Sequence, residues 1–248
     1  MNLSSENLSL RRGGRLVLQQ VTASLRPGEI TAICGPNGAG KSSLLMGLAG
    51  LLEPASGRVS LGDDSLLEIQ ARERAKAIGY LPQSADVAWD VSVESLVALG
   101  RLPHRDRGET EVEAAISALN LEDLRRRPAS KLSGGERARA LLARVLAGSP
   151  HWVLADEPLA ALDLAHQLAL ITHFKTCAEA GQGVVIVLHD LALAMNHADR
   201  VLVLREGRLV ADGAPDEALS PENIANGWGI ATEWLGEKGS RALVTRDT

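Results

Sequence analysis

A glycine-rich stretch that ends in Lys-Ser carries the clearest chemistry in this sequence. Residues 35–42 read Gly-Pro-Asn-Gly-Ala-Gly-Lys-Ser and fit G-x-x-x-x-G-K-[ST], the phosphate loop of nucleoside-triphosphate sites. An apolar run over residues 30–34 precedes this stretch, and residues 43–48 follow it with the apolar spacing of a helix. The order of strand, loop and helix is the context that the motif requires. It favours a triphosphate site over the alternative of a chance glycine-rich turn.

The residues of this phosphate loop have distinct expected roles. Glycines permit backbone conformations in which successive N–H groups converge on phosphate oxygens, and the following helix adds the positive end of its dipole. We expect Lys41 to contact the β- and γ-phosphates of ATP and the Ser42 hydroxyl to ligate Mg²⁺. The expected nucleotide-binding residues of this stretch are Gly35, Pro36, Asn37, Gly38, Ala39, Gly40, Lys41, Ser42 and Ser43.

Two adjacent acids follow a strongly apolar strand. Residues 152–155 read Trp-Val-Leu-Ala and lead into Asp156 and Glu157. Ligands of open α/β sheets bind at the carboxyl ends of the strands. We therefore expect Asp156 to hold Mg²⁺, directly or through water, and Glu157 to orient or deprotonate the attacking water. An acidic pair that merely opens a solvated loop is the alternative, and the phosphate loop elsewhere in the chain favours the catalytic interpretation.

A second helix start has the composition of an anion-binding site. Residues 132–136 read Leu-Ser-Gly-Gly-Glu, in which Ser133 and Glu136 form a capping box. The capping box accounts for the serine and the acid but not for Gly134 and Gly135, whose bare N–H groups suit close approach of an anion. Two phosphate-binding helix ends in one small domain predict an ATP molecule that is held from two sides.

The ordered set of motifs resembles that of the ATP-binding cassette (ABC) family. The phosphate loop resembles Walker A, Asp156 resembles the Walker B acid, and residues 132–136 resemble the family signature. Three further matches are Gln83 with the Q-loop glutamine, residues 161–163 (Ala-Leu-Asp) with the D-loop, and His189 with the switch histidine. Order and spacing agree from about residue 3 to residue 215, and the ordered set is far more specific than any one motif.

The resemblance implies how the motifs cooperate. Two such domains are expected to pair head to tail as a homodimer with two ATP molecules between them. Each ATP is expected to lie on Lys41 and Ser42 of one copy and to be closed over by the signature of the other. The expected catalytic residues are Glu157, His189 and Gln83, the metal-binding residues are Ser42, Gln83 and Asp156, and the residues that close the nucleotide site are Ser133, Gly134, Gly135 and Asp163.

Three residues depart from the family pattern. Arg12 stands just before two glycines, where the family usually has an aromatic residue that stacks on adenine. A planar guanidinium can also stack on a base, and a solvated surface arginine is the alternative. Ala160 replaces the serine that commonly begins the D-loop, and Ser43 stands where threonine is usual.

Strands alternate with helices along most of the chain, which predicts an α/β fold. The expected architecture is that of a P-loop NTPase (RecA-like): a mixed sheet with helices on both faces, an N-terminal antiparallel β subdomain and an inserted α-helical subdomain. Within a single domain over residues 1–248, we expect the core and the β subdomain at 1–83 and 132–219. We place the helical insertion at 84–131, and a C-terminal tail without an assigned role at 220–248.

Several local patterns allow narrower predictions. Residues 64–77 are charged and helical in pattern, and the Arg triplet at 125–127 has the composition of a solvated helix end. His166, His173 and Cys177 share one helical stripe that offers metal ligands, but a partly solvated helix face is favoured because no fourth ligand is evident. Two tryptophans near the C-terminus, Trp228 and Trp234, are interpreted as anchors that pack the tail onto the core.

Composition limits the cellular context. The chain has 248 residues, of which 45% are hydrophobic and 23% charged, as in ordinary globular proteins. A net charge of −5 argues against a broad nucleic-acid-binding surface, so no nucleic-acid partner is expected. The only cysteines are Cys34 and Cys177, which favours a reducing cytosol over a disulfide framework. No signal peptide is evident and no run approaches the ~18 apolar residues of a membrane span, so another subunit is expected to supply any span.

These features together predict the ATPase subunit of a bacterial ABC importer, at the cytoplasmic face of the inner membrane. The expected partners are two permease subunits, docked on the helical insertion, and a periplasmic substrate-binding protein. Residues 91–94, 99–104 and 163–167 resemble subunits for iron–siderophore, haem and cobalamin uptake, and residues 11–15 resemble the haem branch. The alternative is a soluble ABC ATPase of DNA repair, chromosome maintenance or translation. Only 91 residues separate Lys41 from Ser133, which leaves no room for the coiled-coil insertion of the first two classes, and the chain holds one cassette where translation types usually hold two.

Overall fold

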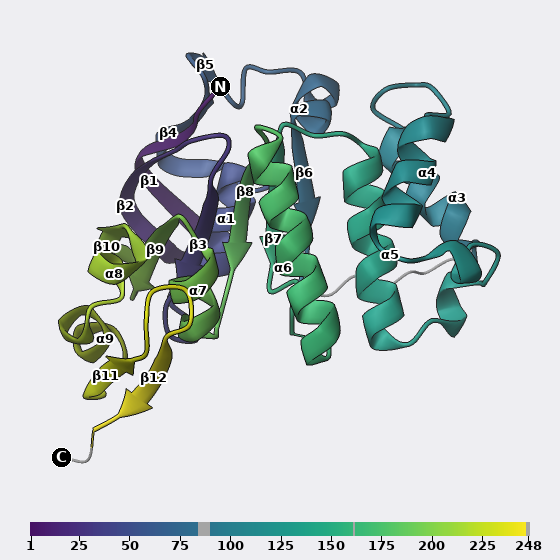
Figure 1. Ribbon diagram of the computed structural model, residues 1–248. Helices are drawn as coiled ribbons and strands as arrows, with labels where there is room; N and C mark the ends of the chain where they lie inside the picture. The colour runs from purple at the N-terminus through teal and green to yellow at the C-terminus, as the bar shows by residue number, and fades with distance from the viewer. Residues whose placement is uncertain (84–89, 161, 247–248) are drawn as a thin grey trace.

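A six-stranded mixed sheet forms the centre of the computed structural model, which describes residues 1–83, 90–160 and 162–246 (Figure 1). The strands, in spatial order, are β10 (Arg208–Gly213), β9 (Arg200–Arg205), β3 (Ile30–Cys34), β8 (Gly183–Val187), β7 (Trp152–Asp156) and β6 (Ile78–Leu81). Only the β9–β10 pair is antiparallel. Strands β3, β7 and β8 are buried along their whole length, which explains their unbroken apolar sequences.

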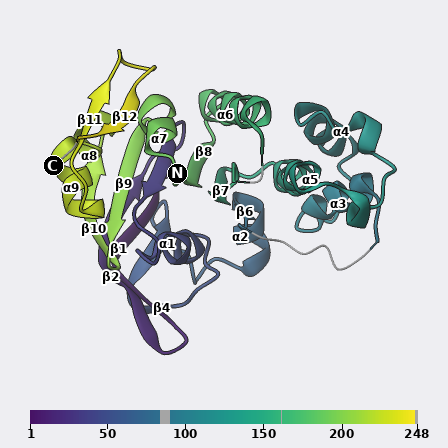
Figure 2. The ribbon, with the colours of Figure 1, turned by 90° about the horizontal axis from the view of Figure 1, so that it is seen from below.

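Helices cover both faces of this sheet. Helices α1 (Lys41–Leu48) and α2 (Ala71–Ala77) lie on one side, and α6 (Leu164–Glu179) and α7 (Leu191–His197) on the other (Figure 2). Successive strand residues point to opposite faces and so join two separate cores. In β3, for example, Ile33 joins the α1 side and Ala32 joins the α6 side. The predicted α/β fold with helices on both faces is confirmed.

An antiparallel sheet near the N-terminus forms the expected β subdomain. Its strands, in spatial order, are β2 (Arg15–Leu25), β1 (Leu3–Arg12), β4 (Pro54–Leu61) and β5 (Asp64–Ser65). The helix predicted over residues 64–77 is wrong in its first half, because a turn at Gly62, with φ of +65°, folds β5 back onto β4. The helical pattern is realised only in α2.

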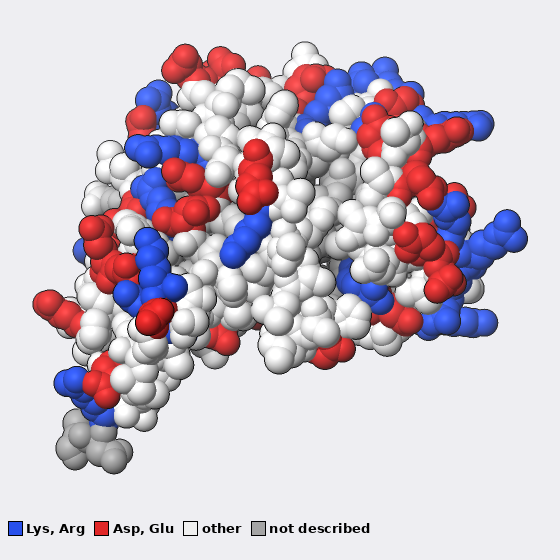
Figure 3. Space-filling view, in the orientation of Figure 1, with Lys and Arg blue, Asp and Glu red and all other residues white. Residues whose placement is uncertain are grey.

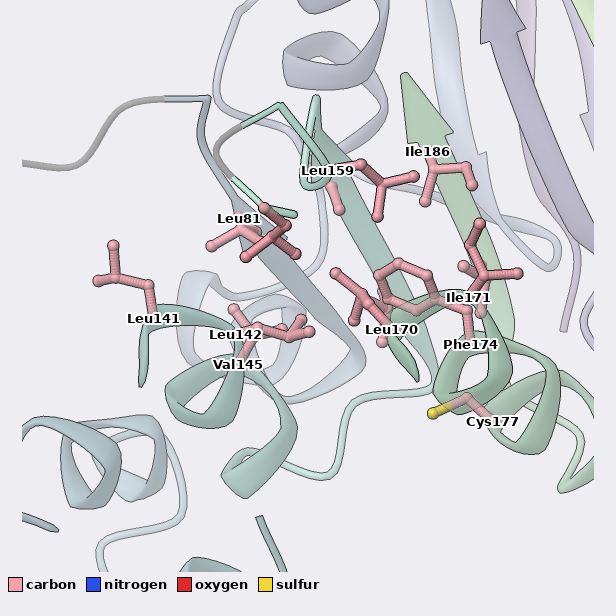
Figure 4. Close-up of a cluster of buried hydrophobic side chains, with 14 of the residues drawn as sticks. Leu81, Leu141, Leu142, Val145, Leu159, Leu170, Ile171, Phe174, Cys177 and Ile186 are labelled. Carbon is pink, nitrogen blue, oxygen red and sulfur yellow. The ribbon is translucent and has the colours of Figure 1, made fainter. Parts of the chain in front are cut away.

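Three helices form the part of the molecule farthest from the β subdomain. They are α3 (Val93–Ala98), α4 (Glu109–Ala118) and α5 (Gly134–Ala147), joined by the one-turn 3₁₀ helices η1 (Leu99–Arg101), η2 (Glu122–Leu124) and η3 (Ala129–Lys131). Leu142 and Val145 of α5 and Phe174 of α6 belong to one buried cluster, which joins this helical layer to the sheet (Figure 4). Residues 84–89, the first of the predicted insertion, lie outside the described chain, and its limits at 84 and 131 stay a prediction.

The arginine triplet at 125–127 stands at the end of η2, and Arg126 and Arg127 are exposed, as expected for a solvated helix end. Arg125 follows η2 rather than an α-helix and pairs with Glu94 and Glu113. Arg127 pairs with Glu136 on the first turn of α5, at 3.1 Å. The triplet therefore connects three helices, a role that depends on carboxylates distant in sequence.

The C-terminal region is ordered by contacts with the core. It comprises α8 (Pro215–Ala218), α9 (Pro221–Trp228) and a hairpin of β11 (Thr232–Leu235) and β12 (Ala242–Thr245). The Trp234 indole donates to the Leu219 carbonyl at 2.8 Å. The Asn196 amide pairs with both backbone groups of Arg241 at 2.8 Å. Trp228 and Trp234 pack half-buried against the core, which confirms their interpretation as anchors.

Charges of both signs are interspersed at both ends of the face that Figure 3 shows. The surface over the middle of this face is largely uncharged. Among the residues that the structure describes, no helix combines the length and the apolar character that crossing a bilayer takes.

Candidate nucleotide-binding site

The carboxyl ends of four neighbouring strands bring the candidate residues together. Strands β6, β7 and β8 are adjacent and parallel, and β3 lies beside β8. The segments that follow them carry Gln83, Glu157, His189 and the phosphate loop. These segments surround one cavity of about 740 Å³. Its lining comprises Arg12, Val17, Asn37, Gly38, Ala39, Gly40, Lys41, Ser42, Ser43, Gln83, Glu157 and His189.

Glycine is required at two positions of the phosphate loop. Gly35 has φ of +150°, and a Cβ there would lie 2.2 Å from the Leu204 carbonyl oxygen. Gly40 caps α1 with φ of +102°, and a Cβ there would lie 2.8 Å from the Val17 carbonyl oxygen. The loop thus packs closely against β2 and β9, in backbone conformations that a residue with a Cβ would adopt only with strain.

Lys41 is directed back toward its own loop. Its Nζ donates to the carbonyls of Gly35 at 2.9 Å and Pro36 at 3.1 Å, and only 6% of the residue is exposed. Burial lowers the pKa of the ammonium from its ordinary value, and the nearby carboxylate of Glu157 opposes this shift. A buried cation with only neutral oxygens as hydrogen-bond partners suits an anionic ligand, because charge-assisted hydrogen bonds are stronger than neutral ones.

Two oxygen donors lie together beside Lys41. The Ser42 hydroxyl donates to Oδ1 of Asp156 at 3.1 Å, and Asp156 is 4% exposed at the end of β7. Burial raises the pKa of Asp156, while the hydrogen bond from Ser42 opposes this shift. A hydroxyl and a buried carboxylate at this separation fit Mg²⁺, which prefers hard oxygen ligands and relieves the cost of a buried negative charge.

Glu157 lies between the other two candidate catalytic residues. Its carboxylate accepts a hydrogen bond from Gln83 Nε2 at 2.7 Å and lies 2.5 Å from His189 Nε2. Its φ of +52° places a non-glycine residue in the left-handed region, at a cost of about 1 kcal/mol. The chain therefore turns sharply after β7 and presents Glu157 to the cavity. The predicted triad of Gln83, Glu157 and His189 is assembled within one chain.

The other candidate residues lie at two helix starts away from this cavity. Ser133 caps α5 in the predicted capping box, followed by Gly134 and Gly135. Asp163 caps α6 and accepts from the backbone N–H of His166 at 2.9 Å. In the described part of the chain none of these residues lines the cavity. Ala161, the first residue of the expected D-loop, lies outside the described residues.

The three residues of the histidine and cysteine stripe on α6 contact different partners in the structure. His166 Nδ1 pairs with Asp163 at 2.8 Å, whereas His173 Nε2 lies 3.5 Å from the buried Cys177 sulfur. Among the described residues no cluster of three His, Cys, Asp or Glu side chains is arranged to hold a metal ion.

Two residues were not singled out from the sequence, one that lines the cavity and one that lies near Asp156 without lining it. Val17 lines the cavity from β2, and the glycine turn before this strand was its only signal. Tyr80, the sole tyrosine, lies half-buried on β6, where burial and then Asp156 raise its pKa to about 12. An isolated aliphatic or aromatic residue on a strand carries no local mark of a binding role.

Comparison with known proteins identifies the family. A family model described as "ABC transporter" matches residues 18–160, which span the phosphate loop, the signature and both acids. The chain belongs to this ABC transporter family. The chain is accordingly an ATP-binding ATPase.

Relatives and solved structures of the same family match nearly the whole chain. The "Hemin import ATP-binding protein HmuV" of Pseudomonas fluorescens is 45% identical, with 92% of each chain covered. The protein of the same name from Pseudomonas aeruginosa is 42% identical, over 98% of this chain and all of the relative. The ATPase of a putative metal-chelate type ABC transporter in an inward-facing conformation matches with a TM-score of 0.81 and 28% identity, over 99% and 97% of the chains. A dimeric ATP-binding cassette bound to ADP and Pi matches at 0.78 and 25%, over 86% and 98%.

Arg12 lines the ABC cavity, so its proposed contact with the base is testable. We expect Arg12→Ala to weaken ATP and GTP binding by the same factor, about two- to tenfold, because stacking of a guanidinium does not distinguish purines. Calorimetric titration of each nucleotide measures the change. Arg15→Ala is the matched control, since Arg15 pairs across the turn with Arg12 but does not line the cavity. Equal affinities of the two variants would instead support a solvated Arg12.

Proposed function

We propose that this ABC ATPase energises a bacterial importer for haem. The observation that carries the proposal is the 42–45% identity, over 92–98% of the chain, to proteins named for hemin import. The cavity is lined by Lys41, Gln83, Glu157 and His189, to which this proposal gives roles in ATP hydrolysis. The soluble alternative in repair, chromosome maintenance or translation is not favoured, because these relatives are import proteins.

In this proposal the phosphate loop and the two acids bind and orient ATP. Lys41 exchanges its two carbonyl contacts for oxygens of the β- and γ-phosphates, which are stronger, charged partners. Ser42 and Asp156 would hold Mg²⁺, and the Gln83 amide oxygen would be a further ligand. When bound, Mg²⁺ supplies positive charge that neutralises the transferring phosphoryl group.

The triad then prepares the attacking water. Glu157 accepts the hydrogen bond of that water in place of one of its present partners, Gln83 or His189. His189 is then free to contact the γ-phosphate. The Gln83 side chain would contact the attacking water or the metal. Preorganised donors of this kind stabilise the charge that develops on phosphoryl transfer without reorganisation.

A second copy of the chain completes the site. Ser133, Gly134 and Gly135 lie outside the cavity of their own chain, so in a head-to-tail homodimer they would close over the ATP of the partner. Asp163, at the start of α6, would lie near the same interface. The similarity to a dimeric cassette bound to ADP and Pi supports this arrangement. ATP binding would close the dimer and product release would reopen it.

The importer context follows from the family and from the relatives. Importer ATPase subunits work with membrane permease subunits, and we propose that two permeases dock on the helical layer of α3–α5. A periplasmic substrate-binding protein would deliver haem to the permeases. The ATPase would then lie at the cytoplasmic face of the inner membrane as a peripheral subunit, with siderophore or cobalamin as the competing cargoes.

Uptake by the reconstituted transporter tests the proposed cargo. We expect a permease complex to co-purify with the tagged chain from its native membrane and to import haem in vesicles when ATP is supplied. Ferric siderophore and cobalamin are assayed in parallel, and a complex that contains Glu157→Gln serves as the inactive control. Uptake of another cargo without haem would reassign the substrate, and the lack of any permease would refute the transporter role.

A further inference from the structure

The start of helix α5 carries a negative charge where a phosphate is expected to bind. Glu136 occupies the third helical position, and its Oε2 accepts from the backbone N–H of Ser133 at 2.8 Å. The hydrogen bond from Ser133 and the nearby Arg127 hold the pKa of Glu136 below its usual range, so the carboxylate is ionised at neutral pH. A carboxylate suits the helix dipole, but it repels any other anion that approaches the same helix end.

Arg127 is the cation that contacts this carboxylate. Its Nη1 donates to Oε1 of Glu136 at 3.1 Å, the oxygen that the capping box leaves open. The backbone of Arg127 is held from both sides, because its N–H donates to Leu124 at 2.8 Å and its carbonyl accepts from Val93 at 3.1 Å. The guanidinium is thereby delivered to Glu136 from a fixed position on the preceding loop.

Of the other basic residues nearby, Arg139 also lowers the pKa of Glu136 through its charge but makes no hydrogen bond to this carboxylate. Arg139, one turn along α5, donates to the carbonyls of Leu119 and Asn120 at 2.9 and 3.1 Å. Arg126 is exposed and makes no ion pair with a described residue. Arg127 is thus the arginine whose position depends on, and compensates, the charge of Glu136.

We propose that Arg127 is a positioning residue that neutralises Glu136, so that the α5 start can accept the γ-phosphate of ATP bound to a second copy. The inference rests on the head-to-tail closure proposed above. Glu136 keeps Ser133 in its capping conformation, and the Ser133 hydroxyl accepts from the Glu136 N–H at 3.3 Å, which leaves its proton free to donate. Arg127 removes the electrostatic penalty that this capping acid would otherwise impose on the incoming phosphate.

ATP-driven dimerisation tests the proposal. All variants are made in the Glu157→Gln background, and light scattering after size exclusion measures the ATP concentration that gives half-maximal dimer. We expect Arg127→Ala to require about three- to tenfold more ATP, because an uncompensated charge then faces the phosphate. Added salt should reduce this deficit. Arg126→Ala, which removes the same charge from the neighbouring position, should change the requirement by less than about twofold.

Removal of the acid separates charge compensation from a structural role. In a Glu136→Gln background, whose amide oxygen still accepts from Ser133, Arg127→Ala should no longer raise the ATP requirement. Thermal unfolding of each variant verifies that the fold is retained. The proposal is overturned if Arg127→Ala matches Arg126→Ala, or if its deficit persists beside Glu136→Gln. Failure of the Glu157→Gln parent to dimerise with ATP would instead refute the head-to-tail closure itself, and this inference with it.

Discussion

Replacing Glu157 with glutamine is expected to lower the rate of ATP hydrolysis by about 10²–10⁴-fold, the usual contribution of a positioned general base. The amide keeps the shape of the carboxylate and a carbonyl oxygen that can accept from Gln83 at the 2.7 Å contact. It cannot accept a proton from water. Because Lys41 and Ser42 are unchanged, ATP affinity should be retained, and ATP should accumulate in a closed dimer. Steady-state phosphate release and nucleotide titration measure the two effects.

The control for this substitution is a glutamine at an acid outside the site. Glu179→Gln, at the end of α6, removes one charge far from the cavity and should leave turnover unchanged. Normal turnover of Glu157→Gln would remove this residue from the catalytic role. The hydrogen-bonded alternative for the base would then be His189, which contacts the same carboxylate.

Replacing Lys41 with alanine is expected to abolish measurable ATP binding, with a loss of affinity of about 10²-fold or more. Two hydrogen bonds to a charged phosphate chain are lost, each worth about 1.5–3 kcal/mol. The truncation also leaves the carbonyls of Gly35 and Pro36 without their buried partner. Calorimetric titration with ATP measures affinity, and thermal unfolding of the free protein reports any effect on the loop itself.

Two companion variants make the Lys41 result specific. Lys76→Ala removes a lysine that pairs with Glu73 on the surface of α2, and ATP affinity should not change. Lys41→Arg keeps the positive charge but replaces a compact ammonium with a planar fork, so affinity should still fall. Retained ATP affinity in Lys41→Ala would contradict the assignment of the phosphate loop.

Local sequence patterns predicted those site residues that lie within a few residues of the end of a strand. The phosphate loop follows β3 and the two acids follow β7, as their apolar runs predicted. Gln83 and His189 follow β6 and β8, the two strands that flank β7, so their meeting at Glu157 is a consequence of parallel pairing. Such residues are readable because a strand's burial and the chemistry at its end are both encoded locally.

Patterns of charge were less informative than patterns of apolarity. The run at residues 64–77 looked helical, yet its first residues pair with β4 through a tight turn. Arg126 and Arg127 are exposed, as predicted, but the triplet gave no sign that Arg127 pairs with Glu136 or that Arg125 pairs with two other helices. A charged side chain is compatible with many local structures, and only the partner that folding brings to it decides its role.

The sequence by itself therefore determined the family and the α/β architecture, and it predicted which residues bind the triphosphate and which acids act beside them. These depend on short-range rules of backbone conformation, burial and motif order. The tertiary structure alone decided that Val17 lines the cavity, that the C-terminal hairpin anchors on α7, and that Arg127 pairs with Glu136. Each of these depends on contacts between segments distant in the chain, which no local periodicity records.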